Sequence, residues 1–205
     1  MPDSQKNNTG CPVCWDTVAT YVNTFFEERV QNLFALAGLV DEVFSAANLD
    51  YAIVGGLAVY LYVEESEPDA GRLTRDIDIL VRRSDLPAIA AAVESYGLEY
   101  RDVAGVDMLL QKGQSARRAV HMVFSGEKVR KEYPEATPEM LPPRILQGVR
   151  LVPAETLIRM KLSSFRLKDQ MHLKDLDEAG VITQGIAESL SPEHRRRLEQ
   201  VRATL

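Results

Sequence analysis

The sequence has few cysteines, no long apolar run and no excess of positive charge, and each absence argues against a class of protein. No apolar stretch approaches the about 20 residues that span a bilayer, and residues 1–10 are polar, unlike a signal peptide. The net charge of −6 argues against a basic surface that binds nucleic acid non-specifically. We therefore expect a cytoplasmic protein that does not associate with membranes.

The two cysteines, Cys11 and Cys14, form a Cys-Pro-Val-Cys turn in a polar segment. This spacing suits half of a zinc site or a redox pair, but there is no second cysteine pair and the three histidines are distant in sequence. A thioredoxin-like motif would follow a strand, and none is predicted here. We favour reduced thiols on a mobile N-terminal arm, residues 1–14.

Length and composition favour one compact unit. The chain of 205 residues, 45% of them hydrophobic and 26% charged, has globular composition and the size at which one domain buries a continuous core. We expect a single domain over residues 15–205. Its helical segment, α/β core and C-terminal helices are predicted at residues 15–48, 49–152 and 153–205.

The periodicity of apolar residues predicts an α/β (α+β) fold, in which a short mixed sheet is flanked by helices. The first helical segment is either one long helix or two helices with a break near Gly38, and Ser84 is placed to cap the third helix. The predicted helices occupy residues 15–48, 57–62 and 84–96 and begin again at Pro153 and Ser191. The predicted strands are residues 50–54, 76–81, 108–111, 119–124 and 148–152.

Asp76 and Asp78 are the candidate metal ligands. Side chains alternate along a strand, so both carboxylates point to one face, about 6 to 7 Å apart. Such a pair can hold Mg²⁺ or Mn²⁺ together with substrate phosphates. Solvated acids on an exposed strand are the alternative. Gly55 and Gly56 favour the metal site, because amides at a strand-to-helix turn can approach a phosphate closely.

Two segments carry a family resemblance: Ile-Val-Gly-Gly-Leu-Ala at residues 53–58 and Leu-Thr-Arg-Asp-Ile-Asp-Ile at residues 73–79. They resemble the Gly-Gly and Asp-x-Asp signature of the DNA polymerase β-like nucleotidyltransferase superfamily. The resemblance extends over about residues 51–182. It is greatest to the branch with the minimal bacterial transferases and the AbiEii-type toxins of toxin–antitoxin pairs.

The resemblance implies a role for each matching residue. The aspartates Asp76 and Asp78 would ligate Mg²⁺ and take part in catalysis. The triphosphate of an NTP would bind at the Gly-Gly turn, and a Thr or Ser and an Arg commonly precede the first aspartate. The nucleotide-binding residues implied in this part of the sequence are Gly55, Gly56, Thr74 and Arg75.

His121 stands where many members of the superfamily carry a third acidic residue on a later strand. A neutral imidazole can act as a general base near neutral pH or ligate a softer metal, but it does not supply a carboxylate's charge. A histidine held by hydrogen bonds in the core is the alternative. Asp107, which precedes the predicted strand at residues 108–111, is a second candidate for the third acid.

The C-terminal region supplies a further signal. If the chain from Lys161 to Asp175 is one helix, Lys161, Lys168, His172 and Asp175 lie within about 60° of one another, at the border of the apolar face. This segment resembles the Lys-rich helix of AbiEii-like proteins, where lysine and aspartate face the nucleotide. A solvated helix edge is the alternative.

Asp169 is the acidic residue of that segment, and on an unbroken helix it falls inside the apolar stripe. We expect its carboxylate to be paired with Arg75 or a lysine, because an unpaired buried charge is costly. The resemblance places Asp169 with Lys161 and Lys168 among the nucleotide-binding residues.

The sequence thus predicts a Mg²⁺-dependent nucleotidyltransferase that moves a nucleoside monophosphate from an NTP to a hydroxyl. The acceptor, an RNA, a protein or a small molecule, is left open, as is a role in a toxin–antitoxin pair with an antitoxin-like partner protein. The alternative is a nucleotidyltransferase-like module that binds nucleotide or a partner without catalysis.

Overall fold

The computed structural model describes residues 15–113 and 119–204, so that the arm with Cys11 and Cys14 lies outside the described residues. The chain forms a mixed α/β structure around a seven-stranded sheet of order β3-β4-β5-β2-β1-β7-β6, which confirms the predicted fold class. The strands are β1 Ala52–Val54, β2 Ile77–Val81, β3 Leu98–Val103, β4 Val106–Gln111, β5 Val120–Phe124, β6 Arg144–Leu146 and β7 Val149–Leu151. The α-helices are α1 Trp15–Ala46, α2 Gly55–Ser66, α3 Leu86–Glu94, α4 Ala154–Ser164, α5 Leu167–Glu178, α6 Gln184–Ser189 and α7 Pro192–Ala203.

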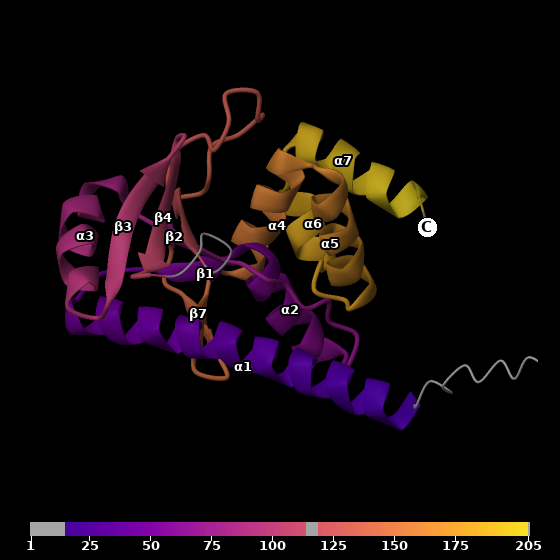
Figure 1. Cartoon of the computed structure of the whole chain (residues 1–205). Coiled ribbons are helices and arrows are strands. Elements are labelled where there is room, and N and C mark those ends of the chain that lie inside the picture. The colour runs from indigo at the N-terminus through magenta and orange to yellow at the C-terminus, as the bar shows by residue number, and fades with distance from the viewer. Residues whose placement is uncertain (1–14, 114–118, 205) are drawn as a thin grey trace, which may run out of the picture.

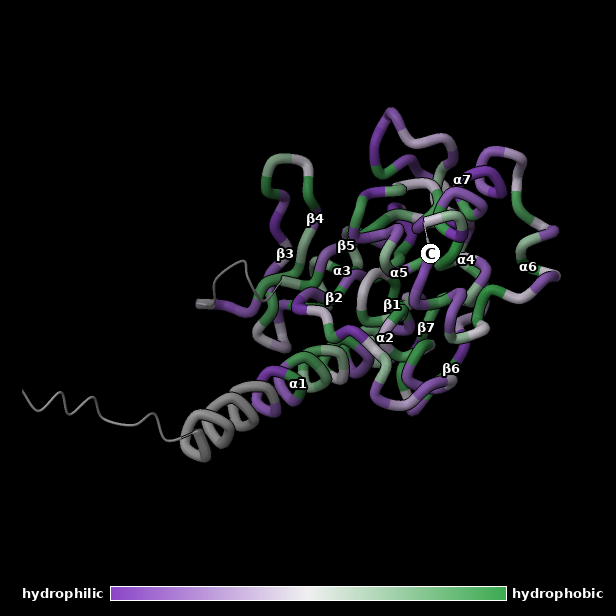
Figure 2. The backbone as a smooth tube through the Cα atoms, turned by 90° about the vertical axis from the view of Figure 1, so that its right-hand side faces the viewer, coloured by the Kyte–Doolittle hydropathy of each residue, from purple (hydrophilic) through white to green (hydrophobic). Residues whose placement is uncertain are grey.

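The helices are divided between the two ends of the sheet (Figure 1). Helix α3 lies beside β3, the helices α4 to α7 gather at the opposite end, and α1 runs beneath both. Hydrophobic segments run through the interior in Figure 2, whereas the hydrophilic segments lie mainly in outer loops. Among the described helices, none combines the length and the apolarity that a membrane span requires.

The middle of the sheet is its most buried part. Strand β1 is buried at every residue and pairs antiparallel with β2, which pairs in parallel with β5. Helix α2 follows β1 directly and contacts both α4 and α5. Its sequence is apolar on all sides, as expected for a helix enclosed between other elements. The site residues on β1, β2 and β5 therefore stand on fixed backbone.

Helix α1 continues through Gly38 without a break, which confirms one of the two forms predicted for the first helix. Other predicted elements need correction. The third helix begins at Leu86 after a 3₁₀ turn, Arg83–Asp85, and Ser84 does not cap it, because its hydroxyl donates instead to the Asp85 carboxylate. Strands β3 and β6 were not predicted, since each lies at an edge of the sheet and lacks a regular apolar alternation. The predicted helix start at Ser191 is confirmed: Ser191 is the N-cap of α7, and its Oγ accepts from the His194 amide.

Candidate functional site

A pocket of about 430 Å³ lies between the sheet and helix α4. Strand ends and the start of α2 form one wall, the turn between α4 and α5 forms another, and the loop of residues 127–137 forms a third. Of the predicted site residues, the pocket brings together Gly55, Asp78, His121, Lys161 and Asp169.

Gly55 stands where β1 ends and α2 begins. Its φ of +71° lies in the left-handed region, and a Cβ built on it would fall 1.9 Å from Asp78 Oδ2. The antiparallel pairing of Val54 with Asp78 causes this close approach. A Cβ on Gly56 would likewise lie 2.7 Å from Thr74 Oγ1. Both positions therefore favour glycine, because the side chains of Asp78 and Thr74 fill the space that a Cβ would take.

Thr74 and Arg75 precede the acidic strand and differ in their surroundings. Thr74 is buried, and its Oγ1 accepts from the Asp76 amide at 3.5 Å, so it supports the turn ahead of β2. Arg75 is exposed and forms no hydrogen bond or ion pair with another described residue. The predicted pairing of Arg75 with Asp169 is therefore wrong.

Asp76 and Asp78 are half-buried at the start of β2. Asp78 lies within the strand and lines the pocket, whereas Asp76 immediately precedes the strand. Among the described residues, no group of three or more His, Cys, Asp and Glu side chains could hold a metal ion. Two carboxylates fit Mg²⁺ when phosphate oxygens and water complete its shell. Gly55 lines the pocket beside Asp78, so such a phosphate would lie next to this turn.

His121 lies next to Asp78 on the parallel strand β5, in direct register with it. Its Nδ1 is 3.5 Å from Asp78 Oδ1, and both side chains are about one-third exposed, at 30% and 31%. The hydrogen bond to Asp78 raises the pKa of His121, and the charges of Asp78 and Asp76 add to this, against an opposing effect of burial. The imidazole thus occupies the pocket and is not enclosed in the core.

Asp107, the other candidate for a third acid, is engaged elsewhere. Its carboxylate accepts a hydrogen bond from the Tyr100 hydroxyl and lies 3.6 Å from Arg83 Nη1. Met108 is the residue in register with His121, so alternation turns Asp107 to the opposite face of the sheet. Asp107 lines the same pocket as Asp78 and His121, but among the described residues these three side chains do not form a group that could hold a metal ion.

The predicted single helix from Lys161 to Asp175 is wrong. Helix α4 ends at Ser164, Phe165 adopts a left-handed φ of 47°, and α5 begins at Leu167. Because the break changes the direction of the chain, the cations do not share one face. Lys161 is buried and lines the pocket, whereas Lys168 is exposed and lies outside the pocket lining.

Asp169 is fully buried and joins α4 to α5. It accepts hydrogen bonds from Ser164 Oγ at 2.7 Å, Arg166 Nε at 2.7 Å and Lys161 Nζ at 3.2 Å. Burial alone would raise its pKa, but the Arg166 hydrogen bond and the Lys161 charge outweigh it and lower the pKa to about 2. The expected pairing with a lysine is confirmed.

Arg166 is one of the charged pocket residues that the sequence prediction left out of the site. It caps α5, and its side chain binds Asp169 while it lines the pocket beside Lys161. Burial lowers the pKa of Lys161, and the charges of Asp169 and Asp78 oppose that shift. The sequence did contain a signal for Arg166. One lysine cannot donate to both oxygens of a buried Asp169 carboxylate and balance its charge, so a second cation was to be expected nearby.

Comparison with known proteins identifies the fold. A scan of family models and a search of curated proteins found no match. Among solved structures, an antigenic nucleotidyltransferase-like protein from Paracoccidioides brasiliensis is similar, with a TM-score of 0.56 and 16% identity over 85% of this chain and 88% of that one. The Megavirus polyadenylate synthase has a TM-score of 0.50 and 8% identity, over 89% of this chain and 41% of that one. These similarities show a nucleotidyltransferase fold.

Replacing Gly55 with alanine tests the close approach to Asp78. We expect Gly55→Ala to lower the free energy of unfolding by about 1 to 3 kcal/mol more than Gly97→Ala, because only the first substitution also forces atoms together. Gly97 is a matched control: its φ is +74°, and a Cβ there meets nothing within 4 Å. Chemical denaturation measures both, and equal losses would contradict the proposed geometry.

His172 should make the protein sensitive to acid. Burial, with the charges of Lys161 and Lys168, lowers its pKa from 6.5 to about 4, and its Nδ1 has no hydrogen-bond partner among the described residues. The unfolded chain then binds the proton more tightly, so stability is lost as pH falls from about 6.5 to about 4, by up to about 3 kcal/mol. Denaturation of His172→Gln across this range should give a smaller loss than wild type; an identical pH dependence would contradict the assignment.

Proposed function

We propose that this protein transfers a nucleoside monophosphate from an NTP to a hydroxyl group, with Mg²⁺ or Mn²⁺. The observation that carries the proposal is the register of β1, β2 and β5, in which Asp78 has Gly55 on one side and His121 on the other. The nucleotidyltransferase fold supports the same reaction class. Lys161 faces this arrangement from α4 and provides a cation for a triphosphate.

Each residue has a distinct part in the proposed reaction. The amides at Gly55 and Gly56, at the N-terminus of α2, would bind phosphate oxygens. Asp76 and Asp78 would hold the divalent cation, which neutralises triphosphate charge and favours in-line attack. Lys161 would bind the phosphates from the other wall while Asp169 keeps it oriented.

His121 is the proposed general base. An acceptor hydroxyl would attack the α-phosphorus, its proton would pass to the imidazole, and pyrophosphate would leave. The Asp78 carboxylate orients the ring through Nδ1 and strengthens it as a base. RNA, protein and small molecules all carry suitable hydroxyls, and the AbiEii-type resemblance adds a toxin with an antitoxin-like partner to this proposal.

A second candidate function is a nucleotide-binding or partner-binding module without catalysis. The observation that favours it is the imidazole at position 121, because the site then has two carboxylates where the superfamily commonly has three. The intact Asp76 and Asp78 favour the enzyme. Incubation with each labelled NTP, Mg²⁺ or Mn²⁺ and cellular RNA or extract distinguishes the two, since only the enzyme labels an acceptor.

Loss of either aspartate should abolish the proposed transfer. We expect Asp76→Ala and Asp78→Ala each to reduce it by about 100-fold or more, a loss that even outer-shell metal partners can cause. Thermal melts should also show that Mg²⁺ with NTP stabilises wild type but neither variant. Glu94→Ala is the control, because Glu94 is exposed on α3 and has no ion pair among the described residues. Retained transfer in either aspartate variant would contradict the proposal.

Substitutions of His121 test whether it acts as the general base. As a base, His121→Ala should lower the transfer rate by about 10²- to 10⁴-fold with little change in nucleotide affinity. His121→Asp restores a third carboxylate beside Asp78 and should strengthen Mg²⁺ binding in calorimetric titrations. If His121→Ala loses only as much rate as it loses folded protein, the ring has no catalytic part.

A further inference from the structure

One wall of the pocket is a loop of residues 127–137, called here the lid loop. It is closed at its base: the Thr137 amide donates to the Glu127 carbonyl at 2.9 Å, and the Gly126 amide donates to the Thr137 carbonyl at 3.1 Å. The Thr137 hydroxyl adds hydrogen bonds to the carbonyls of Phe124 and Glu127. The two ends of the lid loop are thus fixed to the end of β5, as in an Ω-loop.

The tip of the lid loop has little apolar anchorage. Val129 is 54% exposed, and no hydrophobic side chain of the loop belongs to the core formed by the described residues. The polar contacts near the tip are internal: the Tyr133 amide donates to the Arg130 carbonyl, and Arg130 pairs with Glu132 at 3.8 Å. A loop with these features opens at low cost unless a polar contact retains it.

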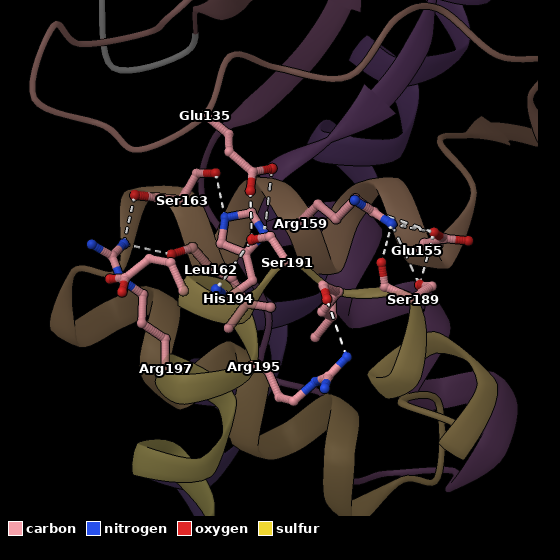
Figure 3. A network of polar contacts seen from close by, with 12 residues as sticks. Glu135, Glu155, Arg159, Leu162, Ser163, Ser189, Ser191, His194, Arg195 and Arg197 are labelled. Atoms are coloured by element: carbon pink, nitrogen blue, oxygen red, sulfur yellow. Dashed lines mark hydrogen bonds and ion pairs between the residues drawn. The ribbon is translucent and has the colours of Figure 1, made fainter.

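Glu135 provides that contact (Figure 3). Its Oε1 accepts a hydrogen bond from Ser191 Oγ at 2.6 Å, and its Oε2 lies 3.5 Å from His194 Nδ1. Both partners are at the N-terminus of α7, where the helix dipole also favours a carboxylate. Among the described residues, no other side chain of the lid loop forms a hydrogen bond or ion pair with helices α4 to α7.

The surface that receives Glu135 is rigid. His194 is fully buried, its Nε2 shares a hydrogen bond of 2.9 Å with Ser163 Oγ, and its Nδ1 has no partner closer than Glu135. Arg197 holds α7 to α4 through the carbonyls of Leu162 and Ser163. The charged groups around the imidazole are Glu135, Arg159, Glu193 and Arg197. Ser163 itself lines the pocket, two residues after Lys161.

We propose that Glu135 is a positioning residue that latches the lid loop over the pocket, so that the residence time of a bound nucleotide depends on it. The identity of the ligand as a nucleotide rests on the proposed function. The latch itself rests only on the contacts of Glu135 with Ser191 and His194. Glu135 connects the loop to α7, and His194 connects α7 through Ser163 to α4, the helix that carries Lys161. The latch therefore acts on the wall that faces the triphosphate.

Hydrogen exchange of the lid-loop amides tests the latch without any ligand. In the full chain, Glu135→Ala should accelerate exchange in residues 127–137 by about tenfold or more, the change expected when one hydrogen bond to a charged group is lost. Glu135→Gln keeps an oxygen for the Ser191 hydroxyl and should give a smaller increase. Glu132→Ala is the matched control on the same loop and should leave exchange unchanged.

Nucleotide release tests the consequence. Stopped-flow displacement of a fluorescent, non-hydrolysable ATP analogue with Mg²⁺ should show faster dissociation from Glu135→Ala, with the association rate changed less and Glu132→Ala like wild type. Unchanged exchange in Glu135→Ala would overturn the latch, and faster exchange with an unchanged dissociation rate would overturn its role in retention. If wild type binds no fluorescent analogue of ATP, GTP, CTP or UTP, the proposed function and this role both fail, and exchange still decides whether Glu135 holds the loop.

Discussion

The carboxylate of Asp78 occupies space that a side chain at residue 55 would fill, and the layout of the site depends on this contact. Pairing of β1 with β2 sets Val54 opposite Asp78, so the next residue must turn sharply within reach of that carboxylate. Only glycine allows both the left-handed φ and the approach. Helix α2 can therefore start at the strand end with its amides beside the acids, and its burial between the sheet and α4 and α5 keeps them there.

The parts of the site that follow from local geometry could be predicted from the sequence. The Gly-Gly turn and the alternation of Asp76 and Asp78 depend on neighbours in the chain. The position of His121 beside Asp78 depends on the register of two strands more than 40 residues apart. The family resemblance suggested this position, whereas the apolar pattern within each strand does not determine the register. Edge strands such as β3 have too few buried positions to produce the apolar alternation by which a strand is recognised in a sequence.

The break between α4 and α5 shows a different limit of sequence reasoning. Counting 100° per residue assumed an unbroken helix, and on that assumption Asp169 fell in the apolar stripe. In the structure, the left-handed turn at Phe165 brings Lys161, Ser164 and Arg166 around that carboxylate. A charged residue inside an apolar stripe was therefore evidence for a salt bridge. It was also evidence against one unbroken helix from Lys161 to Asp175, because a buried carboxylate needs several hydrogen-bond donors around it.

Helix α4 connects two walls of the pocket, its own at Lys161 and, through Ser163 and His194, the lid loop. Lys161 lines the pocket with Asp78, and Ser163 fixes the histidine that receives Glu135. Lys161 and Ser163 are two positions apart on α4, so the helix cannot shift at one without shifting at the other. In the proposed function, a triphosphate bound at Lys161 would therefore favour the helix position in which the lid loop is held, and a held lid loop would exclude water that weakens the Lys161 interaction.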